Sequence, residues 1–265
     1  MMLNSVQTFE DKISIYIAGD STACNYEAAR TPRTGWGQVL GRFFTDQVII
    51  KNEAISGRSS MSFINEGALE KIESQITPGD YLFIQFGHND EKKEDPARYT
   101  EACTTFKVYL TQYIQSARNK QAVPVLLTPI HRCQFGQNGK IMSTHGDYPK
   151  AMLELAVLEQ VPVIDLTEQT RILMERVGPK KSNLFFMNLK PGEFFNYPNG
   201  SRDNTHLRQE GALEIARLVT VGIRQVKLPL EKYIRPELNH HRLQPVGSLA
   251  DCKSAKESGG IQTRR

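Results

Sequence analysis

Four short polar clusters carry the residue types needed for chemistry in this chain of 265 residues. The clusters occupy 19–22, 54–60, 87–90 and 203–206. Each alone is also typical of an ordinary turn, since Gly, Asp, Asn and Ser are common turn residues. Together they supply a serine, a histidine and an aspartate. Nucleophilic acyl transfer needs this set, because a base takes the serine proton and a carboxylate orients the base.

Ser21 is the candidate nucleophile, because it follows a predicted strand and its hydroxyl would lie exposed at the end of a sheet. His206 is the candidate base, and Asp203 would hold its ring. A spacing of three residues at the mouth of a predicted helix brings these two side chains within reach of each other. One short segment would then provide both the base and the group that orients it.

Three groups near these residues are candidate donors to the oxyanion of a tetrahedral intermediate. They are the amide N–H of Ser21, the amide N–H of Gly57 and the side-chain NH2 of Asn89. A glycine at position 57 would let the backbone come close to the reacting carbonyl. The competing interpretations are a plain loop glycine at 57 and an asparagine at 89 that only caps a turn.

Short apolar runs alternate with helical periods, and the resulting elements must position the clusters. Strands are predicted at 13–18, 48–55, 81–86, 123–128 and 161–166. Helices are predicted at 99–117, where apolar residues recur at intervals of four and three, and at 208–226. Strands separated by helix-length connections predict an α/β fold with a parallel sheet covered on both faces. Such sheets bind ligands beyond the carboxyl ends of their strands, where the first three clusters fall.

Two segments interrupt this alternation. Residues 178–204 are rich in Pro, Gly and Asn, and we predict a long loop of the kind that is often functional. The aromatic residues of 185–197 within it are candidates to border a cleft. Apolar periodicity ends near Pro229, so we predict one catalytic domain at 1–228 and a flexible tail at 229–265.

The blocks Gly19-Asp20-Ser21, Gly57, 87–90 and Asp203-x-x-His206 resemble, in this order, the SGNH (GDSL-like) hydrolase superfamily over residues 12–226. The segments 19–22, 57–60, 128–132, 144–149 and 203–206 are similar to its rhamnogalacturonan acetylesterase branch. The resemblance implies a three-layer α/β/α flavodoxin-like fold with a central parallel sheet. It also implies removal of acetyl groups from pectic carbohydrate with no metal and no cofactor. By the same resemblance, Ser21, Asp203 and His206 form the triad, with Gly57 and Asn89 in the oxyanion hole.

The sequence disfavours two other classes of enzyme and leaves two alternative functions open. For a metal-dependent phosphoesterase, the candidate ligands would be Asp20, His88, Asp90, Asp203 and His206. No Asp-x-His pair follows the first predicted strand, and the His and Asn of 87–90 stand in the wrong order for that family. An α/β-hydrolase would need a G-x-S-x-G turn, which the sequence lacks. A lipase or thioesterase of the same superfamily stays open, as does a carbohydrate-binding protein that has lost the chemistry.

Several polar residues near the blocks are interpreted as structural. Asp20 and Asp90 are expected to bind loop backbone as Asx turns. His131 and His145 are candidates to line the cleft, and neither is expected to be catalytic. Trp36, the single tryptophan, is expected in the core rather than against a sugar. The four cysteines form no C-x-x-C pair, and free thiols are expected.

The formal net charge of +4 does not predict a nucleic-acid partner, because most of this charge lies in the last 35 residues. Residues 231–265 carry seven Lys or Arg and four Asp or Glu, which leaves the preceding residues at a net +1. No apolar run approaches the roughly 18 residues that span a bilayer, so no membrane contact is expected either. The expected partner is an acetylated carbohydrate, and the oligomeric state stays open.

The first residues show no basic segment followed by an apolar one. We therefore expect a cytoplasmic protein, or a secreted one if a leader has been removed.

Overall fold

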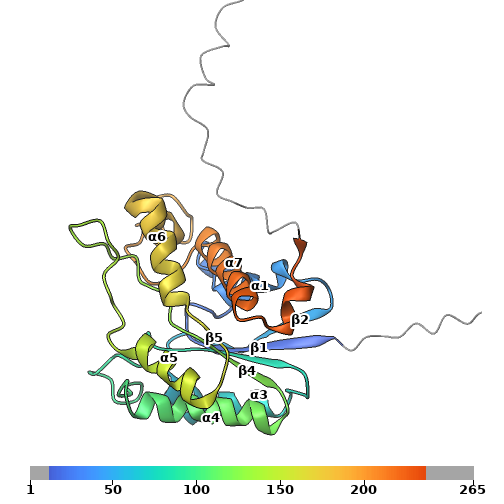
Figure 1. Cartoon of the computed structure of the whole chain (residues 1–265). Helices are drawn as coiled ribbons and strands as arrows, with labels where there is room; N and C mark the ends of the chain where they lie inside the picture. The colour runs from blue at the N-terminus through green and yellow to red at the C-terminus, as the bar shows by residue number, and fades with distance from the viewer. Residues whose placement is uncertain (1–11, 237–265) are drawn as a thin grey trace, which may run out of the picture. The chain divides into compact units, whose positions relative to one another are not determined.

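Five parallel strands form the centre of the computed structural model, which describes residues 12–236 (Figure 1). The strands are β1 (Ile13–Gly19), β2 (Val48–Asn52), β3 (Tyr81–Gln85), β4 (Val123–Leu127) and β5 (Val163–Ile164). They lie in the order β2-β1-β3-β4-β5, and every neighbouring pair is parallel. The predicted parallel sheet is confirmed, as are the positions of its strands within a few residues.

The register between β1 and β3 decides where a site can form. Ile15 pairs with Tyr81, and Gly19 pairs with Gln85, so the two strands end side by side. The strand order reverses between β1 and β3, and in sheets of this order the crevice beyond this switch point is the usual ligand site. The chain that follows Gly19 and the chain that follows Gln85 therefore meet at one edge of the sheet.

Helices cover both faces of the sheet (Figure 1). One face carries α2 (Ser60–Asn65), α3 (Ala68–Glu73), α4 (Thr105–Asn119) and α5 (Tyr148–Glu159). The other face carries α1 (Trp36–Leu40), α6 (Leu166–Ser182) and α7 (Gln209–Gln225). Short 3-10 turns lie at Ala28–Arg30, Gly41–Phe43, Asn183–Phe185 and Pro229–Tyr233. The predicted three-layer α/β/α fold is confirmed.

The sequence predicted the ends of helix α7 more accurately than the start of helix α4. Helix α7 matches the prediction closely, and a Cβ at Gly222 would lie 2.3 Å from the Ile164 side chain, so the helix packs directly onto β5. Helix α4 buries its predicted stripe but begins at Thr105 instead of 99. Cys103 precedes it and is exposed, because Thr100 is bound by its hydroxyl to Asp90 and holds this segment in a turn.

The long loop is shorter than predicted. Gly178, with φ of 79° and ψ of 169°, is not helical and divides Leu166–Ser182 into two helical segments, the second of which begins at Pro179. A 3-10 turn follows to Phe185. Glycine permits this positive φ, so the chain can change direction at Gly178 and form a second helical segment directly afterwards. The loop therefore starts at 186 and not at 178.

The predicted domain boundary at 228 falls inside packed structure. Pro229–Tyr233 form a 3-10 turn in which Leu230 is fully buried. Ile234 is also buried and forms a β-bridge with Phe44. These residues belong to the compact unit that ends at Ile234. Most of the predicted tail, residues 237–265, lies outside the described residues.

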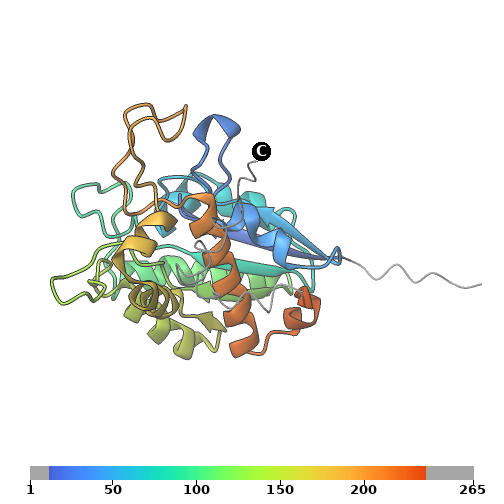
Figure 2. The same cartoon turned by 90° about the horizontal axis from the view of Figure 1, so that it is seen from above.

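Two loops from distant parts of the chain stand side by side above the sheet (Figure 2). One contains Ala28–Arg30, and the other runs through 190–200. The Asn196 amide donates to the carbonyl of Thr31 at 3.3 Å, and the Tyr197 hydroxyl donates to the carbonyl of Arg30 at the same distance. Within residues 12–236, no helix is long and apolar enough to span a membrane.

Candidate active site

Ser21 lies in a tight turn directly after β1. The carbonyl of Asp20 accepts hydrogen bonds from the amides of Ala23 and Cys24, at 3.2 and 3.1 Å. The Asp20 carboxylate also accepts from the Thr22 amide at 2.8 Å, which closes the turn as an Asx motif. The turn holds Ser21 at the carboxyl end of the strand with only 7% of its surface exposed.

Ser21, His206 and Asp203 form a continuous line of hydrogen bonds. The Oγ of Ser21 lies 3.0 Å from Nε2 of His206, and Nδ1 of His206 lies 2.7 Å from Oδ2 of Asp203. Because Nδ1 faces a carboxylate, it carries the ring proton and donates it, which leaves Nε2 to accept from the serine hydroxyl. This is the arrangement in which a histidine can take a proton from serine.

Backbone amides, as well as the His206 ring, hold the Asp203 carboxylate in place. Its Oδ1 accepts from the amides of Thr205 and His206, each at 2.9 Å, and its own amide donates to Asn188 Oδ1 at 3.0 Å. Burial would raise the pKa of this carboxyl, but hydrogen bonds from the His206 ring and these amides outweigh burial and lower it. Asp203 therefore stays ionised across the neutral pH range.

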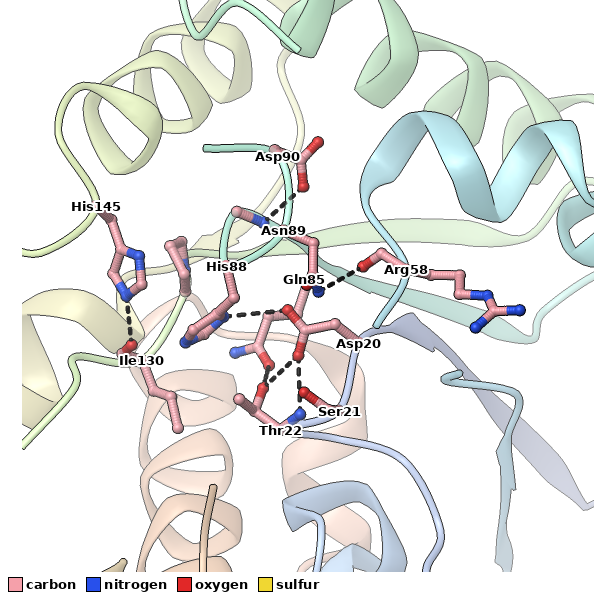
Figure 3. A network of polar contacts seen from close by, with 12 residues as sticks. Asp20, Ser21, Thr22, Arg58, Gln85, His88, Asn89, Asp90, Ile130 and His145 are labelled. Carbon is pink, nitrogen blue, oxygen red and sulfur yellow. Dashed lines mark hydrogen bonds and ion pairs between the residues drawn. The ribbon is translucent and has the colours of Figure 1, made fainter. Parts of the chain in front are cut away.

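The three predicted oxyanion donors lie on the segments that follow β1, β2 and β3. Within the described residues, the amides of Ser21 and Gly57 donate to no protein acceptor. Gly57 has a φ of +81°, a conformation that favours glycine, and an added Cβ there would meet nothing within 4 Å. Asn89 Nδ2 donates to the carbonyl of Arg58 at 3.0 Å, which uses one of its two hydrogens (Figure 3). Arg98 donates to Asn89 Oδ1 at 3.3 Å, so the amide is held from both ends.

A buried polar network lies beneath Ser21 (Figure 3). Asp20 is fully buried and accepts from the Thr22 hydroxyl at 2.8 Å and from His88 Nδ1 at 3.1 Å. Burial raises the pKa of Asp20, but the charge of His88 and these hydrogen bonds prevail and lower it. Gln85 accepts from Trp36 Nε1 at 2.7 Å and from Thr22 at 3.2 Å. Asp20 and Trp36 therefore have the structural surroundings expected from the sequence.

Asp90 joins the segments after β2 and β3. Its carboxylate accepts from the amide and hydroxyl of Ser60, from the Gly87 amide at 3.1 Å and from the Thr100 hydroxyl at 3.0 Å. Burial raises the pKa of Asp90 to about 6, against the lowering effect of the Ser60 and Thr100 hydrogen bonds. The carboxylate fixes Ser60, and with it the turn that contains Gly57.

His131 and His145 are buried and do not line an open cleft. His145 Nε2 donates to the carbonyl of Ile130 at 2.9 Å, and burial lowers the pKa of His145 to about 4. Burial likewise lowers the pKa of His131, which is 6% exposed. Within the part of the chain that the structure describes, no three His, Cys, Asp or Glu side chains are arranged to hold a metal ion.

A cleft of about 490 Å³ is lined by the segments that follow Ser21 and β2. Its lining includes Tyr26, Arg33 and Ser56. The Tyr26 hydroxyl donates to the backbone carbonyl of Ser21 at 2.7 Å, so this wall contacts the candidate nucleophile directly. Of the aromatic residues in the long loop, Phe186 is buried, whereas Phe195 is 98% exposed at the loop tip.

Two residues at the site, Arg33 and Tyr26, are not indicated by any sequence pattern. Arg33 Nη2 lies 3.0 Å from Asp203 Oδ2, and Tyr26 contacts Ser21. Both belong to an irregular segment after β1, where no periodicity indicates which side chains turn inward. The partner of Arg33 is 170 residues away in the chain, a contact that no local pattern encodes.

The chain is similar to a family of esterases and to several known proteins. The GDSL-like Lipase/Acylhydrolase family model matches residues 17–212. The chain is 45% identical to the rhamnogalacturonan acetylesterase RhgT of Bacillus subtilis over 222 residues, which cover 84% of this chain and 94% of that protein. It is 42% identical to the probable rhamnogalacturonan acetylesterase YesY of the same organism, over 84% of this chain and 98% of that protein. A crystal structure of Bacillus subtilis YxiM matches with a TM-score of 0.68 and 29% identity, covering 82% of this chain and 58% of that one.

Proposed function

Because the chain belongs to the GDSL-like lipase/acylhydrolase family, we propose that it is a serine esterase that removes O-acetyl groups from rhamnogalacturonan or its fragments. The observation that carries the proposal is the line of contacts from Ser21 through His206 to Asp203, at 3.0 and 2.7 Å. The substrate class rests on the printed names of relatives at 45% and 42% identity, each matched over nearly its whole length.

The proposed reaction begins when Ser21 Oγ attacks the carbonyl carbon of an acetyl ester. His206 Nε2 takes the serine proton, and the resulting imidazolium is stabilised by the Asp203 carboxylate. The negative charge that develops on the carbonyl oxygen is met by the amides of Ser21 and Gly57 and by the second hydrogen of Asn89 Nδ2. His206 then gives its proton to the sugar oxygen, which leaves as a free hydroxyl, and Ser21 carries the acetyl group.

The second half of the reaction regenerates the enzyme. A water molecule gives a proton to His206 Nε2 and attacks the acetyl-Ser21 carbonyl. When the tetrahedral intermediate collapses, acetate leaves, and the proton on His206 returns to Ser21 Oγ. Every step uses groups of this chain and water. No step requires a metal or cofactor.

Acetate release from a panel of substrates tests the proposal. The panel comprises acetylated rhamnogalacturonan fragments, acetylated xylan, p-nitrophenyl acetate and a p-nitrophenyl ester of a long fatty acid. We expect kcat/KM to be highest for the rhamnogalacturonan fragments and to be unaffected by EDTA. Faster cleavage of the long-chain ester would favour a lipase or thioesterase. Loss of activity in EDTA with recovery on adding a divalent metal would overturn the serine mechanism.

A further inference from the structure

Arg33 reaches the carboxylate that orients the candidate base. Its Nη2 donates to Asp203 Oδ2 at 3.0 Å, and the same oxygen accepts from His206 Nδ1 at 2.7 Å. The other oxygen, Oδ1, is occupied by the amides of Thr205 and His206. Four donors therefore surround the Asp203 carboxylate, and its plane cannot turn without breaking at least one of these contacts.

The protein holds Arg33 in place through several contacts. Its backbone forms a β-bridge with Arg208, and the following amide, of Thr34, donates to the carbonyl of Leu207 at 3.0 Å. The guanidinium lies over the Tyr26 ring, 5.6 Å from its centroid. Tyr26 in turn donates to the carbonyl of Ser21. The segment after β1 and the segment before α7 are thus tied together at Ser21, Tyr26, Arg33 and Asp203.

We propose that Arg33 is a positioning residue of this site, which fixes the Asp203 carboxylate against the His206 ring and sets the pH at which His206 begins to act as a base. The inference rests on the proposed esterase function. Arg33 acts through Asp203, since its contact is with the carboxylate and not with Ser21 Oγ. Nothing in the sequence pattern around 33 assigns it this role.

The charge of Arg33 opposes the charge that His206 gains during the reaction. The two distances to Oδ2 place Arg33 Nη2 and His206 Nδ1 within about 6 Å of each other, where two cations repel measurably even in a solvated site. Arg33 also shares the oxygen that stabilises the imidazolium. Both effects disfavour protonated His206, so the neutral base persists to lower pH than it would without Arg33.

Other titratable and charged groups also lie near this pair. Glu27 and Arg30 line the same cleft as Arg33, and Asp20, whose pKa is lowered, precedes Ser21 in the chain. Tyr26 and Cys24 line the same cleft as Arg33, and burial raises the pKa of each, so both stay neutral. Arg208, which begins the segment leading into α7, is engaged by Glu193 at 3.0 Å. Of the charged groups, Asp203 contacts the His206 ring directly, and Arg33 contacts the same carboxylate oxygen.

The test is the pH dependence of kcat/KM for p-nitrophenyl acetate in the full-length protein. In Arg33→Gln, we expect the acid limb to move to higher pH by about half a unit to one unit, the size of a single cation's effect at this separation. Arg33→Lys keeps the positive charge, and its acid limb should stay at the wild-type position. Its kcat should still fall, because a lysine ammonium does not reproduce the guanidinium geometry.

Arg42→Gln is the matched control. Arg42 is exposed in the 3-10 turn Gly41–Phe43. The residues after this turn bond to Tyr233 and Ile234, which follow the carboxyl end of α7, whereas His206 precedes the amino end of that helix. A helix of 17 residues separates them by roughly 25 Å. The same loss of charge at that distance should leave the acid limb unmoved. Arg33→Met keeps an unbranched apolar chain over Tyr26 and replaces the Gln variant if that variant does not fold, with the same shift expected.

The results separate this inference from the proposed function. If the wild type hydrolyses acetyl esters through Ser21 but the acid limb of Arg33→Gln or Arg33→Met does not move, Arg33 is merely structural and the inference is wrong. An equal shift in Arg42→Gln would also overturn it. If the wild type releases no acetate from any acetyl ester, the proposed function itself fails.

Discussion

The Oγ of Ser21 lies 3.0 Å from Nε2 of His206, although 185 residues separate the two in the chain. Neither residue belongs to a regular element. Ser21 is placed by the turn after β1, and His206 by the segment that leads into α7. The contact therefore depends on the packing of α7 against the sheet, where Gly222 allows the helix to approach Ile164 closely.

Replacement of Ser21 by alanine should abolish turnover without disturbing the fold. The change removes one oxygen from a residue that is 7% exposed and leaves the Asp20 turn intact, because that turn uses backbone and the Asp20 side chain. We expect kcat/KM for p-nitrophenyl acetate to fall by at least about 10⁴-fold. Thermal unfolding, followed by the fluorescence of buried Trp36, should stay within a few degrees of wild type. Substantial remaining turnover in Ser21→Ala would exclude this residue as the nucleophile.

The side-chain amide of Asn89 is expected to act on the transition state. Asn89→Ala should lower kcat by about 10²- to 10³-fold with little change in KM, because an oxyanion donor contributes mainly after the carbonyl oxygen becomes charged. Arg98→Gln serves as the control, since it removes a contact to Asn89 Oδ1 but keeps the donating Nδ2 and its bond to Arg58. Equal losses in the two variants would mean that Asn89 acts only through the local packing.

The sequence could predict the sheet and the convergence of the clusters. Strands β1, β3 and β4 are short apolar runs that are almost wholly buried, which is the pattern that the inner strands of a parallel sheet produce. Once the strands are placed, their carboxyl ends share one edge, so residues after β1 and β3 must approach each other. The Asp203-x-x-His206 spacing is local and needs no knowledge of the fold. These features follow from the types and spacing of residues that are close together in the chain, so the sequence alone predicts them.

The remaining features depend on contacts that no local pattern specifies. Helix α4 starts six residues after its predicted start, because Thr100 is held by Asp90, which comes from the end of another element. The Gly178-Pro179 pair interrupts α6 as such a pair usually does, but helical turns resume at Pro179, where the sequence predicted a loop. Arg33 takes its place at Asp203 through a tertiary contact with a segment 170 residues away. For α4 and for Arg33, contacts between segments that are not adjacent in the chain decide the outcome.

Asp90 should be more important for stability than for catalysis. Its carboxylate accepts from four donors on three residues, and replacement by asparagine would turn an NH2 group toward at least one of these donors. We expect Asp90→Asn to lower the free energy of unfolding by about 2 to 4 kcal/mol at pH 8, as measured by urea titration of Trp36 fluorescence. Asp147→Asn, at an exposed helix start with no side-chain cap bond, should change it by less than about 0.5 kcal/mol. A loss below about 1 kcal/mol in Asp90→Asn would show that the site tolerates the unpaired donor.

His145 should make the protein less stable as the pH falls. Burial lowers the pKa of His145 to about 4 in the folded chain, compared with about 6.5 in an unfolded one. Between these values the unfolded chain binds a proton that the folded chain does not, so the contribution of His145 is complete above pH 6.5 and declines as the pH falls toward 4. The full decline amounts to about 3 kcal/mol.

The comparison of the wild type with His145→Gln isolates this effect. Asp90 acts in the opposite direction, because burial raises its pKa to about 6 and its protonation in acid favours the folded state. The wild-type curve alone therefore mixes the two contributions, whereas the difference between the two proteins removes the contribution of Asp90. It contains His145 together with its partner Glu91, which lies 3.1 Å from His145 Nδ1 and whose pKa is lowered in part by that hydrogen bond. The side-chain amide introduced by His145→Gln retains a donor for the Ile130 carbonyl, which His145 Nε2 bonds in the wild type. Urea titrations at pH 8 and pH 5 should show a smaller loss of stability in His145→Gln than in the wild type. Equal losses in the two proteins would show that His145 binds its proton as readily in the folded state as in the unfolded one.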